Sequence, residues 1–121
     1  MRNINSLDEI IESYNVFLFD QWGVLHNGKK LYNNAEKVIE KLLNLKKKVF
    51  IVSNSGKRSF DNIDRLKLLG ANNILKSEII TSGDVCYYYL VNEKGSLKKI
   101  GKKYYPIGID YPLLKNTQFT K

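Results

Sequence analysis

The sequence predicts an α/β fold in which helices and a parallel sheet form three layers. The alternation of two kinds of segment favours it. Short apolar runs at residues 16–20, 49–54 and 78–82 alternate with longer segments whose apolar residues recur at helical spacing. Parallel strands need a long crossover, usually a helix, and such crossovers are right-handed in nearly all proteins. The order strand, helix, strand, helix, strand, helix therefore indicates a Rossmann-type parallel sheet with right-handed crossovers.

The first predicted elements are a short helix and a buried strand. Residues 8–15 have their apolar side chains on one side of a helix, and Ser6 and Glu9 have the spacing of a capping box. Residues 16–20 are a continuous apolar run that closes with an aspartate. Such a run is typical of a strand covered on both faces.

Three longer helices are predicted around the strands. Residues 33–48 begin with asparagines, carry apolar side chains at helical spacing and place lysines in the last turn, where they suit the helix dipole. Residues 59–70 form a second amphipathic segment, which Gly70 ends, and residues 83–95 form the third. These segments alternate with the predicted strands.

Composition limits the classes of protein. The chain has 121 residues, about one small domain, and its 43% hydrophobic residues favour a packed core over disorder. No run approaches the roughly 18 apolar residues of a membrane span, and the N-terminus is too polar for a secretory signal, so we expect a cytoplasmic protein without a membrane partner. Cys86 and His26 are single, which excludes a disulfide framework and a cysteine-based zinc site but not an oxygen-liganded magnesium site.

The charge of the chain is positive. The net charge is +8, from 20 Lys and Arg residues against 12 Asp and Glu residues. This balance favours anionic partners, either phosphate esters or nucleic acid. The lysines are scattered through 41–48 and 95–103 rather than gathered into one recognition segment. We therefore expect that nucleic acid is not the partner.

Polar residues close every predicted strand. They are Asp20 for the first strand, Ser53 and Asn54 for the second, and Thr81 and Ser82 for the third. The carboxyl ends of parallel strands meet at one edge of the sheet, where such folds bind ligands. After Ser55, the glycine, cations and free amides of residues 56–59 suit a phosphate at a helix N-terminus. The alternative is that these hydroxyl and amide side chains only cap helices.

Three segments resemble, in their order, the first half of the haloacid dehalogenase superfamily core. They are FLFDQWGVLHNG, NNAEKVIEKLLNLKKKVFIVSNSGKRS and EIITSGDVCYYYL. The resemblance covers about residues 12–92 and is closest to the NagD-like class IIA phosphatases, among them hydrolases with a DxWGVxHxG-type opening. It implies a magnesium-dependent phosphatase that acts on a small phosphorylated substrate through an aspartyl-phosphate. The order of the motifs is more specific than any one of them.

The resemblance implies roles for residues at the strand ends. Asp20 matches the nucleophile that accepts the phosphoryl group. Asp20 and the backbone carbonyl of Trp22 match ligands of Mg²⁺. Ser53 matches the phosphate-binding hydroxyl, with Asn54 and Ser55 following it in the same loop.

Trp22 stands where the family has a second aspartate that acts as general acid and base. An indole cannot supply the proton that a leaving alkoxide needs. His26 is a candidate for this proton transfer, because the ordinary pKa of histidine suits the task. The alternative is a loop histidine held by structural hydrogen bonds.

The third and fourth motifs of the family follow an inserted cap. They are a lysine that neutralises nucleophile and phosphate, and an acidic pair that completes the magnesium shell. Here the chain ends at Lys121, residues 102–115 resemble the strand at which such caps begin, and Asp110 has no acidic neighbour. We therefore expect residues 1–121 to be the N-terminal part of such a core, a truncated half core, with the start of a cap or a tail at about 94–121.

This half core is expected to bind magnesium weakly and to be weakly active or inactive as an isolated chain. An unpaired strand edge and uncovered apolar surface favour self-association or pairing with the missing C-terminal half. Two other interpretations stay open. One is a non-catalytic module that binds phosphate, another anion or nucleic acid, and the other is the inert product of a truncated gene.

Overall fold

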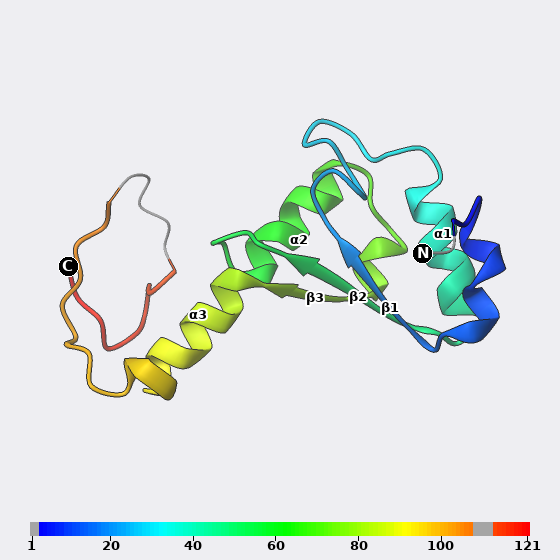
Figure 1. Cartoon of the computed structure of the whole chain (residues 1–121). Helices are drawn as coiled ribbons and strands as arrows, with labels where there is room; N and C mark the ends of the chain where they lie inside the picture. The colour runs from blue at the N-terminus through cyan, green and yellow to red at the C-terminus, as the bar shows by residue number, and fades with distance from the viewer. Residues whose placement is uncertain (1–2, 108–112) are drawn as a thin grey trace.

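The computed structural model describes residues 3–107 and 113–121, and its centre is a parallel sheet in the order β1–β2–β3 (Figure 1). The strands are β1 (Val16–Asp20), β2 (Lys48–Ser53) and β3 (Glu78–Thr81). The helices are α1 (Ala35–Asn44), α2 (Ser59–Leu68) and α3 (Ser82–Val91). Short 3-10 turns lie at Leu7–Glu9, Ile11–Ser13, Ile74–Lys76 and Gly95–Leu97. The predicted α/β fold with a parallel sheet is confirmed.

The register of the sheet brings the carboxyl ends of the strands to one edge. Asp20 of β1 is level with Val52 of β2, and Ser53 of β2 is level with Thr81 of β3. β2 lies in the middle of the sheet. The polar residues that close the strands therefore stand along the same edge, as the sequence predicts.

The core lies between one face of the sheet and the helices α1 and α2. Phe17, Val49 and Ile51 alternate along their strands, point to this face and are buried. They belong to one apolar cluster with Ile39 of α1 and Leu66 of α2. The helical spacing of apolar residues turns one stripe of each helix towards the strands, so both helices cover the same face.

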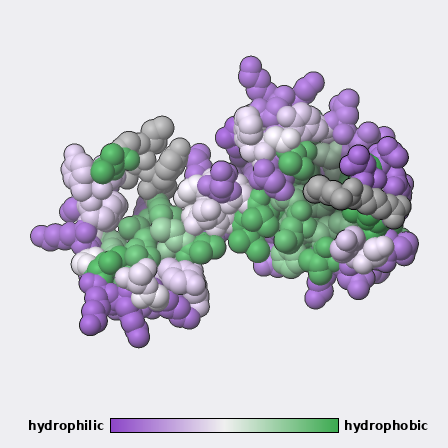
Figure 2. All heavy atoms as spheres, in the orientation of Figure 1, coloured by the Kyte–Doolittle hydropathy of each residue, from purple (hydrophilic) through white to green (hydrophobic). Residues whose placement is uncertain are grey.

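The opposite face of the sheet is open in the part of the chain that the structure describes. Val16, Leu18 and Val52 lie on it, and Leu18 keeps 69% of its surface exposed. Figure 2 shows hydrophobic residues gathered over the strands in this view. β1 is also an edge strand, with unpaired backbone groups along its outer side among the described residues. No helix in residues 3–107 or 113–121 is long and apolar enough to cross a bilayer.

The prediction of an α-helix over residues 8–15 is wrong. Two 3-10 turns stand there, and the Ser6 side chain caps neither of them. The Glu9 carboxylate instead accepts a hydrogen bond from the backbone N–H of Asn5 over 2.8 Å. Ile11 is the one buried residue of the two turns. A longer helix would therefore have little core contact to stabilise it, and short helices depend on such packing.

α1 ends before the lysine run that was predicted to fill its last turn. Asn44 is its last residue, and Lys46 has a left-handed backbone with φ +58°. Lys41 is the basic residue of the last turn. At the other end Asn34 precedes the helix, as predicted, but its side chain makes no capping hydrogen bond. Its φ of 69° differs from the extended backbone that a capping residue needs.

The segment after α3 forms no strand in its described part. Lys103 and Thr120 make an isolated bridge, and Phe119 is buried. In Figure 1 this segment lies beyond the far end of α3, away from the sheet. The strand expected within 102–115 is therefore not formed by the residues described there, and Asp110 lies outside the described residues.

Candidate functional site

Asp20 is the last residue of β1 and lies exposed at the carboxyl edge of the sheet. Its Oδ1 accepts a hydrogen bond from the backbone N–H of Gln21 over 2.8 Å. Within the described residues its second carboxylate oxygen has no hydrogen-bond partner. One oxygen therefore fixes the carboxylate at the strand end, and the other is open to a ligand.

Residues 21–28 form a compact loop directly after β1. The Gln21 carbonyl accepts from the backbone N–H groups of Leu25 and His26 over 3.0 and 3.4 Å. Gly23 donates its N–H to the His26 carbonyl over 2.8 Å and has φ +86°. A side chain disfavours such a left-handed backbone, so a glycine suits this position.

Trp22 is largely exposed, and its carbonyl oxygen accepts none of the hydrogen bonds that the structure describes in this loop. The side chain keeps 64% of its surface exposed. Among the described residues, the backbone hydrogen bonds of this loop use other carbonyls, those of Gln21, Leu25 and His26. The Trp22 carbonyl and the Asp20 carboxylate are thus two oxygen donors of the kind that Mg²⁺ prefers.

His26 is buried, with both ring nitrogens facing groups of its own loop. Nδ1 accepts a hydrogen bond from the backbone N–H of Gly28 over 2.9 Å, and Nε2 lies 3.3 Å from Gln21 Nε2. A neutral ring that accepts at Nδ1 carries its proton at Nε2 and needs an acceptor there. As assigned, Gln21 Oε1 is buried without a hydrogen-bond partner. Exchanging the amide oxygen and nitrogen of Gln21 places the oxygen beside His26 Nε2, where it accepts the ring N–H.

Burial lowers the pKa of His26, and the nearby Arg65 guanidinium lowers it further. The ring is therefore neutral at physiological pH, and its single N–H faces Gln21. This geometry favours the structural alternative for His26 over the role of proton donor to a substrate.

Serine hydroxyls order the second loop, residues 53–58. Ser53 is buried, and its Oγ accepts from the backbone N–H of Ser55 over 3.2 Å. Ser55 Oγ accepts in turn from the backbone N–H of Lys57 over 3.2 Å and from the side-chain amide of Asn62 over 3.4 Å. Such side-chain turns hold both hydroxyls at the carboxyl end of β2.

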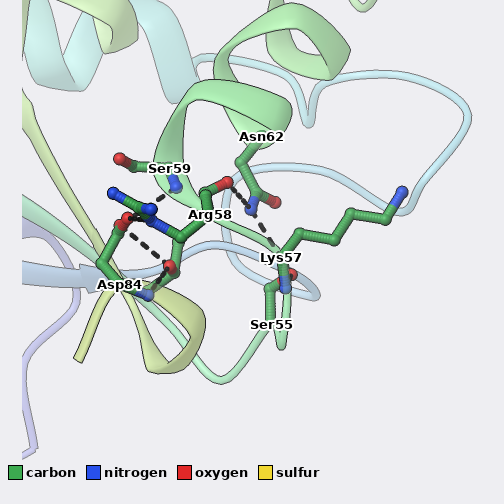
Figure 3. Close-up of polar contacts among 7 residues, drawn as sticks. Ser55, Lys57, Arg58, Ser59, Asn62 and Asp84 are labelled. Atoms are coloured by element: carbon green, nitrogen blue, oxygen red, sulfur yellow. Dashed lines mark hydrogen bonds and ion pairs between the residues drawn. The ribbon is translucent and has the colours of Figure 1, made fainter. Parts of the chain in front are cut away.

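Asp84 of α3 occupies the anion position expected for a phosphate at the start of α2 (Figure 3). Its Oδ2 accepts from the Ser59 backbone N–H over 3.0 Å, and its Oδ1 accepts from Arg58 Nε over 2.7 Å. Thr81 caps α3 by accepting from the Asp84 backbone N–H over 3.0 Å, and its hydroxyl donates to Asp84 Oδ2 over 2.9 Å. The Ser59 amide is therefore not free, as the expected phosphate role of residues 56–59 requires, while the helix-capping alternative is confirmed for Thr81.

Hydrogen bonds decide the protonation of Asp84. Burial acts to raise its pKa, but hydrogen bonds from Arg58, Ser59 and Thr81 outweigh burial and hold the pKa below its ordinary value. The guanidinium of Arg58 also packs on the Tyr87 ring, with its central carbon 3.7 Å from the ring centroid. Arg58 is thus engaged within the protein rather than directed at a ligand.

A polar pocket of about 160 Å³ opens between the two loops and α2. Its lining residues are Gln21, Trp22, His26, Ser53, Asn54, Ser55, Asn62 and Arg65. The structure thus brings together the predicted phosphate-binding residues 53–55 with Trp22 and His26. Asp20 does not line this pocket, and it stands one residue before the loop that does.

Asn62 and Arg65 of α2 line the pocket but were not predicted from the sequence. They lie three residues apart and hence on one side of the helix. The sequence shows that these two polar residues share one side of the helix, but it does not show that this side faces the strand ends.

The comparisons with known proteins agree with this fold. A family model described as haloacid dehalogenase-like hydrolase matches residues 17–113. The chain belongs to this family. A crystal structure of a hydrolase of the haloacid dehalogenase-like family from Brucella suis 1330 superposes on 97% of the chain with a TM-score of 0.83 and 20% sequence identity. The chain spans 43% of that hydrolase's length. A comparison with curated proteins found no match.

Membership of the haloacid dehalogenase-like hydrolases raises the question of magnesium, which the family generally uses. Asp20 and the Trp22 carbonyl are two oxygen donors. Residues 3–107 and 113–121 contain no group of three or more His, Cys, Asp or Glu side chains placed to hold a metal ion. Magnesium requires near-octahedral coordination and otherwise keeps its waters. The described residues therefore do not complete a tight magnesium site.

Proposed function

We propose that this chain carries the nucleophile side of a phosphoric monoester hydrolase of the class IIA, NagD-like type, acting on a small phosphorylated substrate. The observation that supports it most is the position of Asp20, which closes β1 at the sheet edge that also carries the residue 53–55 loop. Gln21, the residue after Asp20, lines the same pocket as those three residues.

Asp20 is the group that attacks phosphorus in this proposal. Its free carboxylate oxygen forms a bond to phosphorus, the bond to the leaving oxygen breaks, and the electron pair departs with the alkoxide. Water then attacks phosphorus, releases inorganic phosphate and restores the carboxylate. Residues 53–55 hold the phosphate oxygens through hydroxyl and amide groups. Attack of an anion on an anion is slow unless positive charge offsets the repulsion, so the step depends on charge compensation.

The proton supply is the weak part of this site. Trp22 has no proton of suitable acidity, and the His26 N–H faces Gln21. General acid help typically contributes about 10²- to 10⁴-fold in rate. The chain should therefore turn over alkyl phosphates poorly, while leaving groups that depart without a proton are affected less.

Covalent phosphorylation tests the nucleophile directly. We expect the chain, supplied with the matching C-terminal half of an intact relative and with acetyl phosphate, to gain one phosphoryl group by mass spectrometry. Asp20→Asn should abolish this adduct, and Asp64→Asn, which changes an exposed aspartate of α2, should preserve it. An adduct or aryl phosphate turnover that survives Asp20→Asn and chelation of magnesium contradicts the proposal.

The alternative is a non-catalytic module that binds phosphate or another anion. The polar pocket favours it, because binding in that pocket needs no nucleophile. The two functions differ in one result: a binding module holds inorganic phosphate but never forms the covalent adduct, even when the C-terminal half is supplied.

A further inference from the structure

One cation lines the pocket although the proposed reaction assigns it no role. Arg65 of α2 donates through Nη2 to the Gly28 carbonyl over 3.3 Å, and Asn62, one turn earlier, donates to Ser55 Oγ over 3.4 Å. The same side of α2 thus holds both loops that form the pocket. Arg65 is exposed, so it is accessible from solvent.

Arg65 keeps donors that the protein does not use. A guanidinium has five N–H donors, and the contact with Gly28 uses one of them. In residues 3–107 and 113–121 no carboxylate pairs with Arg65. The residues that line the pocket include no aspartate or glutamate, and buried His26 stays neutral. The pocket therefore carries positive charge that no described residue offsets.

The Trp22 indole N–H lies beside the same cation. A Cβ atom placed on Gly28 would lie 3.3 Å from both Trp22 Nε1 and Arg65 Nη2. Two hydrogen-bond donors from separate elements are therefore within reach of one point. Gly28, at φ +87°, leaves the space between them open, because any other side chain would be strained there and would crowd both nitrogens.

We propose that Arg65 and the Trp22 indole N–H, together with Ser53 and Ser55, bind the oxygens of a phosphate in this pocket. The ligand is inorganic phosphate or the phosphate group of an ester. An Arg guanidinium matches phosphate because its fixed fork of donors binds two oxygens at once. This inference rests on the proposed function for its substrate class, and it adds Arg65 and Trp22 to the residues that hold the phosphate group.

Trp22 makes the test direct, because it is the one tryptophan of the sequence. Its fluorescence is followed while inorganic phosphate is added to the whole chain at constant ionic strength, and a parallel titration uses phenylphosphonate as an uncleavable ester analogue. A saturable change is expected for the wild-type chain. Arg65→Gln should weaken phosphate binding about tenfold or more, because it removes a charge-assisted hydrogen bond. Lys67→Gln, which removes an exposed cation of the same helix, should change the dissociation constant less than about twofold.

Three results would overturn the inference. They are no saturable change in the wild-type chain, an unchanged dissociation constant for Arg65→Gln, and an equal loss for Lys67→Gln. If Arg65→Gln loses its helical circular dichroism, Arg65→Lys replaces it. We then expect weaker binding, because lysine lacks the fork, and equal binding overturns the inference.

Failure of this inference and failure of the proposed function give different results. Asp20 does not line the pocket, so Asp20→Asn should retain phosphate binding while it loses the covalent adduct. Phosphate binding without any adduct supports Arg65 and contradicts the proposed reaction. An adduct together with normal binding by Arg65→Gln supports the reaction and contradicts the role of Arg65.

Discussion

Arg58 Nε donates to Asp84 Oδ1 over 2.7 Å, and this contact joins the start of α2 to the start of α3. The Asp84 carboxylate also accepts from the first backbone N–H of α2, that of Ser59. An anion at a helix N-terminus is favourable, and here the protein supplies it from a neighbouring helix. The loop after β2 is therefore anchored by residues that do not line the pocket.

Removing the charge of Asp84 should destabilise the chain. Asp84→Asn leaves Arg58, whose side chain is 24% exposed, without its anion, and the free energy of unfolding should fall by about 1.5–3 kcal/mol. Urea unfolding at pH 7 measures this. Asp64→Asn is the matched control, because Asp64 is 77% exposed in its pair with Lys67, and a change within about 0.5 kcal/mol is expected. Equal losses for both variants would contradict the anchoring role of Asp84.

The same carboxylate should add an acid-sensitive part to the stability. The pKa of Asp84 lies below its ordinary value of 3.8 in the native chain, so the unfolded chain binds the proton first as the pH falls. The contribution is complete above about pH 3.8 and is lost as the pH falls through the native pKa. We expect Asp84→Asn to lose less stability than the wild-type chain between pH 5 and 3, measured by urea unfolding. If the free energies of unfolding of the two chains fall in parallel as the pH drops, this prediction is contradicted.

Gly83 is a second test of the contact between α3 and the loop. A Cβ atom there would lie 2.4 Å from the carbonyl oxygens of Gly56 and Lys57. Gly83→Ala should therefore force the backbone apart and cost about 1–3 kcal/mol. Gly56→Ala has no atom within 4 Å of its new Cβ and serves as the control, with little loss expected. Thermal unfolding of both variants measures the difference, and a harmless Gly83→Ala would refute the close approach.

His26 should make the stability depend on pH near neutrality. Its native pKa is lowered, so the unfolded chain takes up the proton first, near the ordinary value of 6.5. Stability should be complete above that pH and fall as the pH drops from 7 towards 5. His26 is the one histidine of the sequence, so His26→Gln should flatten this slope. If the free energy of unfolding of the variant, measured with urea, depends on pH as steeply as that of the wild type, another group causes the pH dependence.

The open sheet face should promote self-association. Leu18 is 69% exposed on edge strand β1, and Leu18→Lys places a charge where a second chain would pack. We expect dimers or aggregates of the wild-type chain by light scattering at moderate concentration, and fewer of them for Leu18→Lys. Leu68→Lys changes an 88% exposed leucine of α2, outside this face, and should leave association unchanged. A monodisperse wild-type monomer would contradict the prediction.

Restoring an acid next to Asp20 should not by itself create a phosphatase. Trp22→Asp supplies a proton donor, but residues 3–107 and 113–121 contain no group of three or more His, Cys, Asp or Glu side chains placed to hold a metal ion, and none of their cations pairs with Asp20. No measurable hydrolysis of an aryl phosphate is expected. The matching C-terminal half should restore more activity, since an aryl leaving group departs readily without a proton. Substantial turnover by isolated Trp22→Asp would show that proton supply is the main defect.

The strands and their polar ends follow from the sequence because the signal is local. Residues 16–20 are apolar until Asp20, and the alternation with helices fixes a parallel sheet whose carboxyl ends share an edge. The 8–15 helix fails for the opposite reason. Its pattern is also local, but core contacts decide whether so short a helix forms, and Ile11 is the one buried residue there.

The contacts around the site depend on positions far apart in the chain. Arg58 and Asp84 meet because β3 pairs with β2 and delivers the start of α3 to the start of α2. Arg65 reaches Gly28 only because α2 packs with one particular side towards the first loop. The sequence reveals polar positions on a helix, but the rotation of that helix comes from the packing of Leu66 and its neighbours in the core.

The central position of β2 sets an order of assembly during synthesis on the ribosome. β1 leaves the ribosome first but has no strand to pair with until β2 follows it, because β2 lies between the other two strands. The buried residues of the apolar cluster, which include Leu66 of α2, all precede α3 in the chain, so the cluster can form before α3 exists, as N-terminal units generally fold first. The edge with Asp20 and Ser53 thus forms early. The loop after Ser53 waits for Asp84, so a chain stalled before α3 should carry the strand edge with an unanchored loop.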